Sequence, residues 1–123
     1  MPKYLIHMSY SSASWARMIK NPGDRTTALS NIMESLGGSL DSIHWQLGAQ
    51  DAVAIVDLPD SVTAAALTTV IVKTGAFKNV DSHELLTQEQ LLEVLALARG
   101  SADVFEVPGE TDEFEPVELR SVP

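Results

Sequence analysis

The sequence predicts an α+β fold in which four antiparallel strands form one sheet and the connecting helices cover one of its faces. Residues 39–58 read as two strands joined by a tight turn at Gly48. Segments with helical spacing precede and follow this hairpin, and a further strand pattern lies beyond each of them. This order is the split βαβ arrangement, whose two crossover helices lie on the same side of the sheet.

Residues 4–10 alternate in the manner of a strand, and an interrupted helical segment follows them. A short helix capped by Ser11 or Ser12 ends at Pro22, because proline pushes the preceding residue out of helical geometry. Asp24 then caps a second helix. The apolar residues of this helix have the spacing of one buried stripe and are Leu29, Ile32, Met33 and Leu36.

The two strands of the hairpin differ in their patterns and therefore in their expected places in the sheet. Ile43, Trp45 and Leu47 alternate with polar residues, as in a strand with one dry face and one wetter face. Residues 52–56 are apolar throughout, and such a strand is usually covered on both sides. We therefore expect residues 52–56 inside the sheet and the Trp45 strand nearer an edge.

The second half of the chain repeats a helix and a strand and then adds a terminal helix. Asp60 opens a helix that ends near Lys73, and residues 77–86 read as the fourth strand. Thr87 has capping-box spacing with a glutamine three residues later, before a helix that we expect Gly100 to close. The expected apolar side of the Asp60 helix consists of Val62, Ala66 and Val70 with the neighbouring Leu67 and Ile71.

The predicted sheet has one face that its own helices do not cover. Two such sheets packed face to face would bury this face in both copies and would leave a cavity between them. A chain of 123 residues has a real core but gains stability from burying further surface between subunits. We therefore expect a homo-oligomer, a dimer or higher.

The composition restricts the partners of the protein. The net charge is −9, which argues against nucleic acid or an anionic membrane as a partner, because phosphate binding needs clustered Lys and Arg. No apolar run reaches the roughly 18 residues of a membrane span, and the first residues do not resemble a signal peptide. A cytoplasmic protein without a membrane partner is therefore expected. Cysteine is absent from the sequence, which rules out disulfides and thiolate metal ligands.

The negative charge concentrates at the end of the chain and divides it in two. Residues 1–99 have a net charge of −3, whereas residues 100–123 have a net charge of −6. We expect residues 1–99 to form the folded domain and residues 100–123 an acidic arm. The arm contains several apolar residues, so it is expected to lie on a neighbouring subunit with Phe105 and Phe114 as its anchors.

A set of polar and aromatic residues could line the uncovered face of the sheet and its mouth. These candidates for a ligand pocket are His7, Ser9, Tyr10, Trp15, His44 and Gln46. A few donors and acceptors between aromatic walls are typical of small-molecule sites, and a histidine would be the general base of a catalytic one. The alternative for Tyr10 and Trp15 is a structural role as core or interface anchors.

The three histidines, His7, His44 and His83, lie on three different predicted strands. Imidazoles from adjacent strands can bind a transition metal, but the alternative is three polar side chains satisfied by neighbours or water. Metal-binding spacings such as HxH and HExxH are absent, as are the glycine-rich phosphate loops and GxSxG. The sequence therefore predicts neither a metal nor a cofactor.

Several ordered segments of the chain resemble the GYD-domain family. The resemblance covers about residues 3–99 and rests on YLIHMSY, SLGGSLDSIHW, GAQD running into AVAIVDLPD, TAAAL, TGAF and LLTQEQ. It implies a ferredoxin-like fold of the dimeric α+β barrel type and no established biochemical role. Together with the order of elements read above, the expected fold is βαββαβ with an added C-terminal helix. Gln50 stands where the family has the tyrosine of Gly-Tyr-Asp, so a function that depends on this phenol is not expected. Gly48 and Asp51, which suit a turn, are kept.

Two classes of function agree with these observations. The first is an oligomeric module that binds a small molecule, or simply assembles, through the face between two sheets. The alternative is a cofactor-independent enzyme of the oxygenase or isomerase type, acting on a small organic substrate with a histidine in the cavity. The alternative rests on analogy between folds. The two differ in whether His7 or His44 is buried beside a second polar group.

Overall fold

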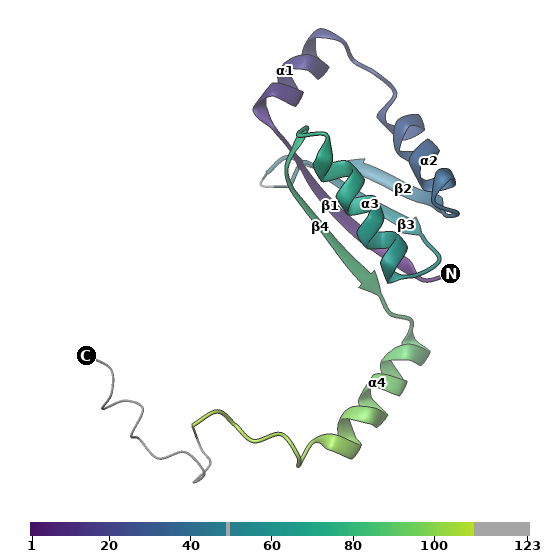
Figure 1. The fold of residues 1–123 in the computed structure, drawn as a ribbon, viewed down its shortest axis with the longest axis vertical. Helices are drawn as coiled ribbons and strands as arrows, with labels where there is room; N and C mark the ends of the chain where they lie inside the picture. Colours follow the sequence, from purple (N-terminus) through teal and green to yellow (C-terminus); the bar gives the residue numbers. More distant parts are fainter. Residues whose placement is uncertain (49, 110–123) are drawn as a thin grey trace, which may run out of the picture. The chain divides into compact units, whose positions relative to one another are not determined.

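A computed structural model describes residues 1–48 and 50–109 of the chain (Figure 1). The contacts within it divide the chain into two units, Met1–Leu86 and Thr87–Pro123. The described residues form four strands and four helices. In chain order they are β1 (Lys3–Tyr10), α1 (Ser12–Lys20), α2 (Arg25–Ser35), β2 (Ser39–Trp45), β3 (Ala52–Asp57), α3 (Ser61–Lys73), β4 (Phe77–Leu85) and α4 (Gln88–Ser101).

The first unit contains one four-stranded sheet with the strand order β2-β3-β1-β4. All three pairs of neighbouring strands are antiparallel. The predicted four-stranded antiparallel sheet of an α+β protein is thereby confirmed. The apolar strand β3 lies inside the sheet and the Trp45 strand β2 lies at its edge, as the hairpin pattern predicted.

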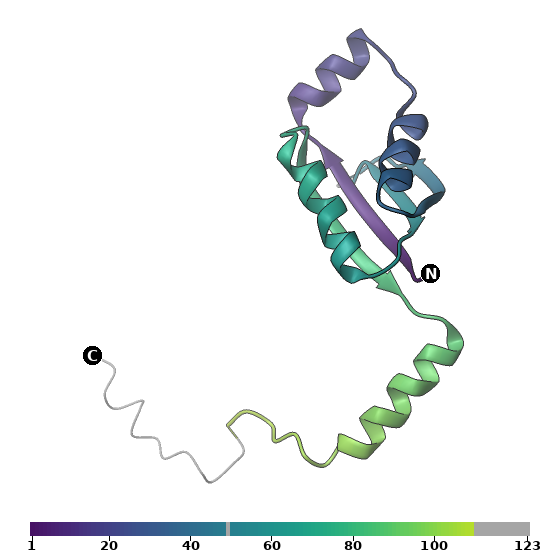
Figure 2. The ribbon, with the colours of Figure 1, turned by 45° about the vertical axis from the view of Figure 1, so that its right-hand side comes forward.

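Helices α2 and α3 lie on the same side of the sheet in both views of the ribbon (Figures 1 and 2). The even-numbered residues of β1 and β3 point toward these helices and are buried, because burial alternates along both strands. Met33 of α2 and Leu67 of α3 are fully buried against them. The core of the first unit therefore occupies the layer between the sheet and these two helices.

Polar residues at the helix starts act as the caps that the sequence predicted. The side chains of Ser11, Asp24 and Asp60 accept hydrogen bonds from the backbone amides of Ser14, Thr27 and Thr63. Each bond satisfies one of the amides that a helix leaves without a partner in its first turn.

The buried face of α3 differs from the expected one. Val62 is 78 % exposed and Val70 is 39 % exposed, whereas Ala64, Leu67 and Ile71 are buried. Leu67 and Ile71 were expected on the apolar side, but the stripe through Val62 was wrong. The reason is that α3 is apolar almost all round, so the spacing of its apolar residues does not single out one face.

A β-bulge interrupts the pairing of β2 with β3. Leu40 pairs with Val56 and Ser42 pairs with Ile55, which leaves Asp41 as an extra residue between them. Because of this extra residue, Leu40 and Ile43 both lie on the side of the helices although they are three positions apart. From residue 42 onward, the side chains of β2 alternate between the two faces of the sheet, as the sequence predicted.

The second unit begins with helix α4. The capping box that the sequence predicted is present: the Thr87 side chain accepts from the Gln90 amide, and the Gln90 side chain accepts from the Thr87 amide. Contrary to expectation, the helix continues through Gly100 and ends at Ser101. Phe105 is 73 % exposed, and Phe114 lies outside the described residues. The domain boundary expected at residue 100 stays a prediction.

None of the helices in the described part of the chain has both the length and the apolar character needed to cross a membrane.

Candidate functional site

The face of the sheet opposite α2 and α3 is the region where the sequence placed a ligand site, and we call it the open face. The strand registers assign the odd-numbered residues of β1 to this face, together with their cross-strand partners. Its centre is apolar and half-buried, with Leu5, Val53 and Ile55 from the two middle strands. Histidines and carboxylates surround this centre.

Two of the predicted site residues, His7 and His44, lie in one row across the open face. His44 pairs with Val53, and Val53 pairs in turn with His7, whose partner on the other side is Asp81. Neighbouring strands are about 4.8 Å apart, so His44 and His7 lie roughly 10 Å from each other. The structure therefore places both histidines on one face but does not bring them into contact.

His7 contacts a histidine that the predicted site did not include. The ring centroids of His7 and His83 are 6.2 Å apart, and the two rings meet edge to face. The Nδ1 atom of His7 is buried and has no hydrogen-bond partner among the described residues. A buried imidazole nitrogen without a hydrogen-bond partner is uncommon in folded proteins.

The other predicted site residues are divided between the two sides of the sheet. Ser9 is buried on the side of the open face. Tyr10 is buried on the side of the helices, where its ring contacts Trp15 at a centroid distance of 5.1 Å. Gln46 lies just beyond the end of β2 and is exposed. His7, Ser9 and His44 thus share the open face, whereas Tyr10 and Trp15 form a separate cluster, and the predicted six-residue pocket stays a prediction.

Asp51 holds this second cluster together, and the sequence indicated only a turn for it. Its Oδ2 atom accepts hydrogen bonds from the backbone amide of Tyr10 at 2.9 Å and from Trp15 Nε1 at 3.3 Å. Its own backbone amide donates to the carbonyl oxygen of Met8. Trp45 Nε1 donates to the Tyr10 hydroxyl at 3.4 Å. One carboxylate thereby joins the end of β1, helix α1 and the start of β3.

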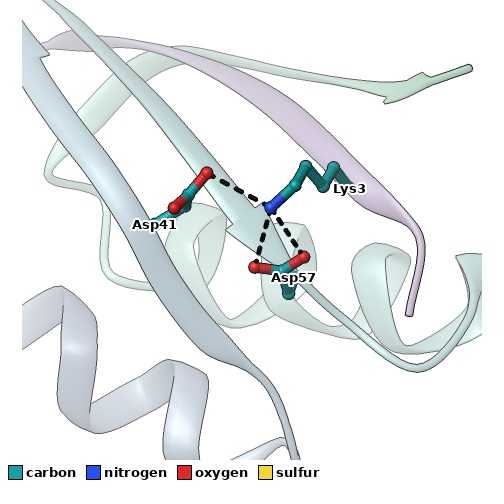
Figure 3. Close-up of polar contacts among 3 residues, drawn as sticks. All are labelled: Lys3, Asp41 and Asp57. Carbon is teal, nitrogen blue, oxygen red and sulfur yellow. Dashed lines mark hydrogen bonds and ion pairs between the residues drawn. The ribbon is translucent and has the colours of Figure 1, made fainter. Parts of the chain in front are cut away.

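Three charged residues close one end of the open face (Figure 3). Lys3 Nζ lies 3.2 Å from Asp41 Oδ2 and 3.0 Å from Asp57 Oδ1. Hydrogen bonds to Asp57 and then to Asp41 raise the pKa of Lys3 above its ordinary value. The cluster ties three neighbouring strands together, and it leaves one unneutralised negative charge at this end of the face.

Within the described residues, no group of three His, Asp or Glu side chains is arranged so that it could hold a metal ion. The contact between His7 and His83 is therefore not part of such a group, although Asp81 is the cross-strand partner of His7.

Residues 4–95 match the GYD domain family, and this match covers most of the chain. The protein therefore belongs to the GYD domain family, as its resemblance to that family indicated. No curated protein and no solved structure matches the chain.

Proposed function

We propose that the protein is an assembling module that binds a small molecule between the open faces of two copies. In this arrangement the sheet adopts the ferredoxin-like topology, and two sheets face each other as a dimeric α+β barrel. The strand order β2-β3-β1-β4 and the placement of α2 and α3 on one side support this arrangement. Family membership over residues 4–95 agrees with it.

The observation that carries the proposal is the character of the open face. Leu5, Val53 and Ile55 form an apolar centre on the two middle strands, where a sheet exposed only to water would have polar side chains. The buried Nδ1 atom of His7 lies beside this centre and has no hydrogen-bond partner in the part of the chain that the structure describes. A second apolar surface would bury the centre, and a small polar group held between the sheets would satisfy the nitrogen.

The assembly is tested by placing a charge in the middle of the apolar centre. Ile55→Glu would put a carboxylate into the interface, and the expected result in light scattering is a change from dimer to monomer. Val62→Glu is the matched control, because Val62 is 78 % exposed on the outer side of α3. A wild-type protein that is monomeric at micromolar concentration would contradict the proposal, as would an Ile55→Glu variant that remains a dimer.

The small molecule is tested by native mass spectrometry of the purified protein. The expected spectrum shows a dimer with a retained mass beyond that of two chains. In His7→Phe this mass is expected to be lost while the dimer persists, because phenylalanine has a similar ring without hydrogen-bonding atoms. A dimer that carries no additional mass, also after exposure to a cell extract, would reduce the function to assembly alone.

The acidic arm of residues 100–123 is proposed to lie on the neighbouring subunit. Phe105, the described anchor, exposes 73 % of its surface, and large exposed apolar side chains of this kind are often contact points. Deletion of residues 101–123 is expected to lower the stability of the dimer, measured as its dissociation on dilution. Unchanged dissociation would remove this part of the proposal.

The contact between His7 and His83 favours a cofactor-independent enzyme as the second candidate. A buried imidazole nitrogen near a second imidazole can exchange a proton with a bound substrate. The compound found by native mass spectrometry would be incubated with the wild-type protein and with His7→Gln. Conversion of the compound by the wild type but not by His7→Gln would support catalysis. If the wild type leaves the compound unchanged, the protein binds it without catalysis.

A further inference from the structure

A pocket of about 180 Å³ lies on the side of the sheet opposite the open face. It opens between α2 and α3, and the strands form its floor. Most of its lining is apolar, including Leu29 and Ile32 from α2, Ile71 from α3, and Tyr10 and Phe77 from the sheet. We call it the helix-side pocket. It belongs to the Met1–Leu86 unit alone, so it does not depend on the assembly proposed above.

Two arginine residues line this pocket and an adjoining hollow. Arg25, the first residue of α2, lines the helix-side pocket and also an adjoining hollow of about 350 Å³. The side chain of Arg25 makes no hydrogen bond or ion pair within the described residues. Arg17 lines the adjoining hollow, and its guanidinium donates to the hydroxyl of Ser14 at 3.1 Å.

The absence of carboxylates from this region contrasts with the acidity of the protein. The chain has 17 Asp and Glu residues, yet no described carboxylate lines the helix-side pocket or the adjoining hollow. Asp24 precedes Arg25, but its carboxylate accepts hydrogen bonds from the amide and hydroxyl of Thr27 at the start of α2. Arg25 is therefore available to a negatively charged group that comes from outside the chain.

Aromatic rings form the part of the wall that the pocket and the hollow share. Tyr10 and Phe77 line both, with their ring centroids 4.9 Å apart. Trp15 contacts the Tyr10 ring, and Trp45 donates to the Tyr10 hydroxyl. Both tryptophans of the chain thus contact Tyr10. A flat ring in the pocket would stack against Tyr10 and Phe77, and tryptophan fluorescence would report its arrival.

We propose that the helix-side pocket binds a small aromatic carboxylate, with the ring between α2 and α3 and the carboxylate on Arg25. Cavities of about 150 Å³ hold a benzene molecule, so a volume of about 180 Å³ accepts one ring with a short substituent. The apolar lining excludes a strongly polar body, such as a sugar. The guanidinium of Arg25 selects the carboxylate over a neutral group of the same shape.

The experiment measures the binding of phenylacetate and of its uncharged analogue phenylacetamide by calorimetry and tryptophan fluorescence. We expect phenylacetate to bind about five- to tenfold more tightly than the amide, which is the range of a partly exposed ion pair. Arg25→Gln is expected to remove this difference and to leave binding of the amide unchanged. Ala28→Phe is expected to weaken binding of both compounds, because Ala28 lines the pocket and the larger side chain would occupy part of it.

Lys20→Gln is the matched control, because it also removes one positive charge but Lys20 lines neither the pocket nor the hollow. This variant is expected to bind both compounds as the wild type does. No binding of phenylacetate at millimolar concentration would overturn the proposal, as would equal binding of acid and amide by the wild type. Light scattering on the same samples keeps this test separate from that of the open face, because a monomer that binds phenylacetate refutes only the assembly.

Discussion

The carboxylate of Asp51 accepts a hydrogen bond from the backbone amide of Tyr10 at 2.9 Å, although the two residues are 41 positions apart. The bond is formed where β1 ends and β3 begins, and the same oxygen also accepts from Trp15 Nε1. The structural role of Asp51 in this chain is to fix the end of the sheet.

Asp51→Ala is expected to destabilise the fold. The substitution leaves the Tyr10 amide without its acceptor, and loss of a hydrogen bond to a charged group costs about 1–3 kcal/mol. The free energy of unfolding would be measured by urea denaturation with tryptophan fluorescence. The emission of Trp15 is expected to change as well, because its indole nitrogen loses the same acceptor.

Asp51→Asn is the control for this substitution. The side-chain oxygen of asparagine can accept the hydrogen bond from the Tyr10 amide, so most of the stability is expected to remain. If alanine and asparagine destabilise the protein equally, the negative charge and not the hydrogen bond holds this end of the sheet.

Gly38→Ala is expected to destabilise the protein strongly. A methyl group on Gly38 would meet the carbonyl oxygen of Asp57 and would lie 2.8 Å from Cδ2 of the fully buried Leu58. The backbone of β2 or β3 must then shift, which is expected to lower the melting temperature by several degrees. Gly23→Ala is the control, because nothing lies within 4 Å of its added methyl group. Equal melting temperatures for the two variants would show that the two strands are not held this closely.

Met33→Ala is expected to cost about 2–5 kcal/mol, the range for truncating a large side chain in a core. Met33 is fully buried between α2 and the sheet. Ile19→Ala removes a comparable side chain from α1, where 78 % of the residue is exposed, and it is expected to change stability by less than about 0.5 kcal/mol. Chemical denaturation of both variants measures the difference. A similar small effect for both would place the core elsewhere.

Acid is expected to destabilise the protein partly through the caps of α2 and α3. Hydrogen bonds from Thr27 and Thr63 lower the pKa of Asp24 and Asp60 below the ordinary value. An aspartate whose pKa is lowered by folding stabilises the folded state when the pH is above its ordinary pKa near 4. This stabilisation is lost as the pH falls through the pKa that the aspartate has in the folded state.

The test compares the wild type with the double variant Asp24→Asn and Asp60→Asn in thermal melts between pH 7 and pH 2. Asparagine also caps helices but does not titrate. The melting temperature of the double variant is therefore expected to fall less on acidification than that of the wild type. The same loss in both proteins would assign the acid sensitivity to other carboxylates.

The elements of the first unit could be predicted because short-range patterns determine them. Alternation identified β1 and β2, the apolar run at Ala54 identified an inner strand, and Asp24 and Asp60 marked helix starts. The pattern failed for α3, where valines lie on several sides of the helix and only the packed structure shows that Leu67 points inward and Val62 outward. It also failed at Gly100, because a glycine can be accommodated inside a helix when the residues around it favour helix.

The candidate sites could be predicted only in part, because they depend on the pairing of distant strands. Alternation correctly placed His7 and His44 on one face of the sheet. The contact between His7 and His83 follows from the register of β1 with β4, which no local pattern specifies. The helix-side pocket depends on the separation of α2 and α3 over the sheet, and the residues near Arg25 do not encode that distance.

The extra residue at Asp41 has a consequence for the solubility of the protein. β2 is an edge strand, and a regular edge offers a row of free backbone groups to which strands of other molecules can add. The bulge between Leu40 and Ser42 breaks the regularity of this row, and the charged Asp41 lies at the break. A chain without Asp41 would keep the same residues facing the helices but would present an even edge. Such a chain is expected to aggregate by edge-to-edge addition of strands, which the natural sequence hinders with a single inserted residue.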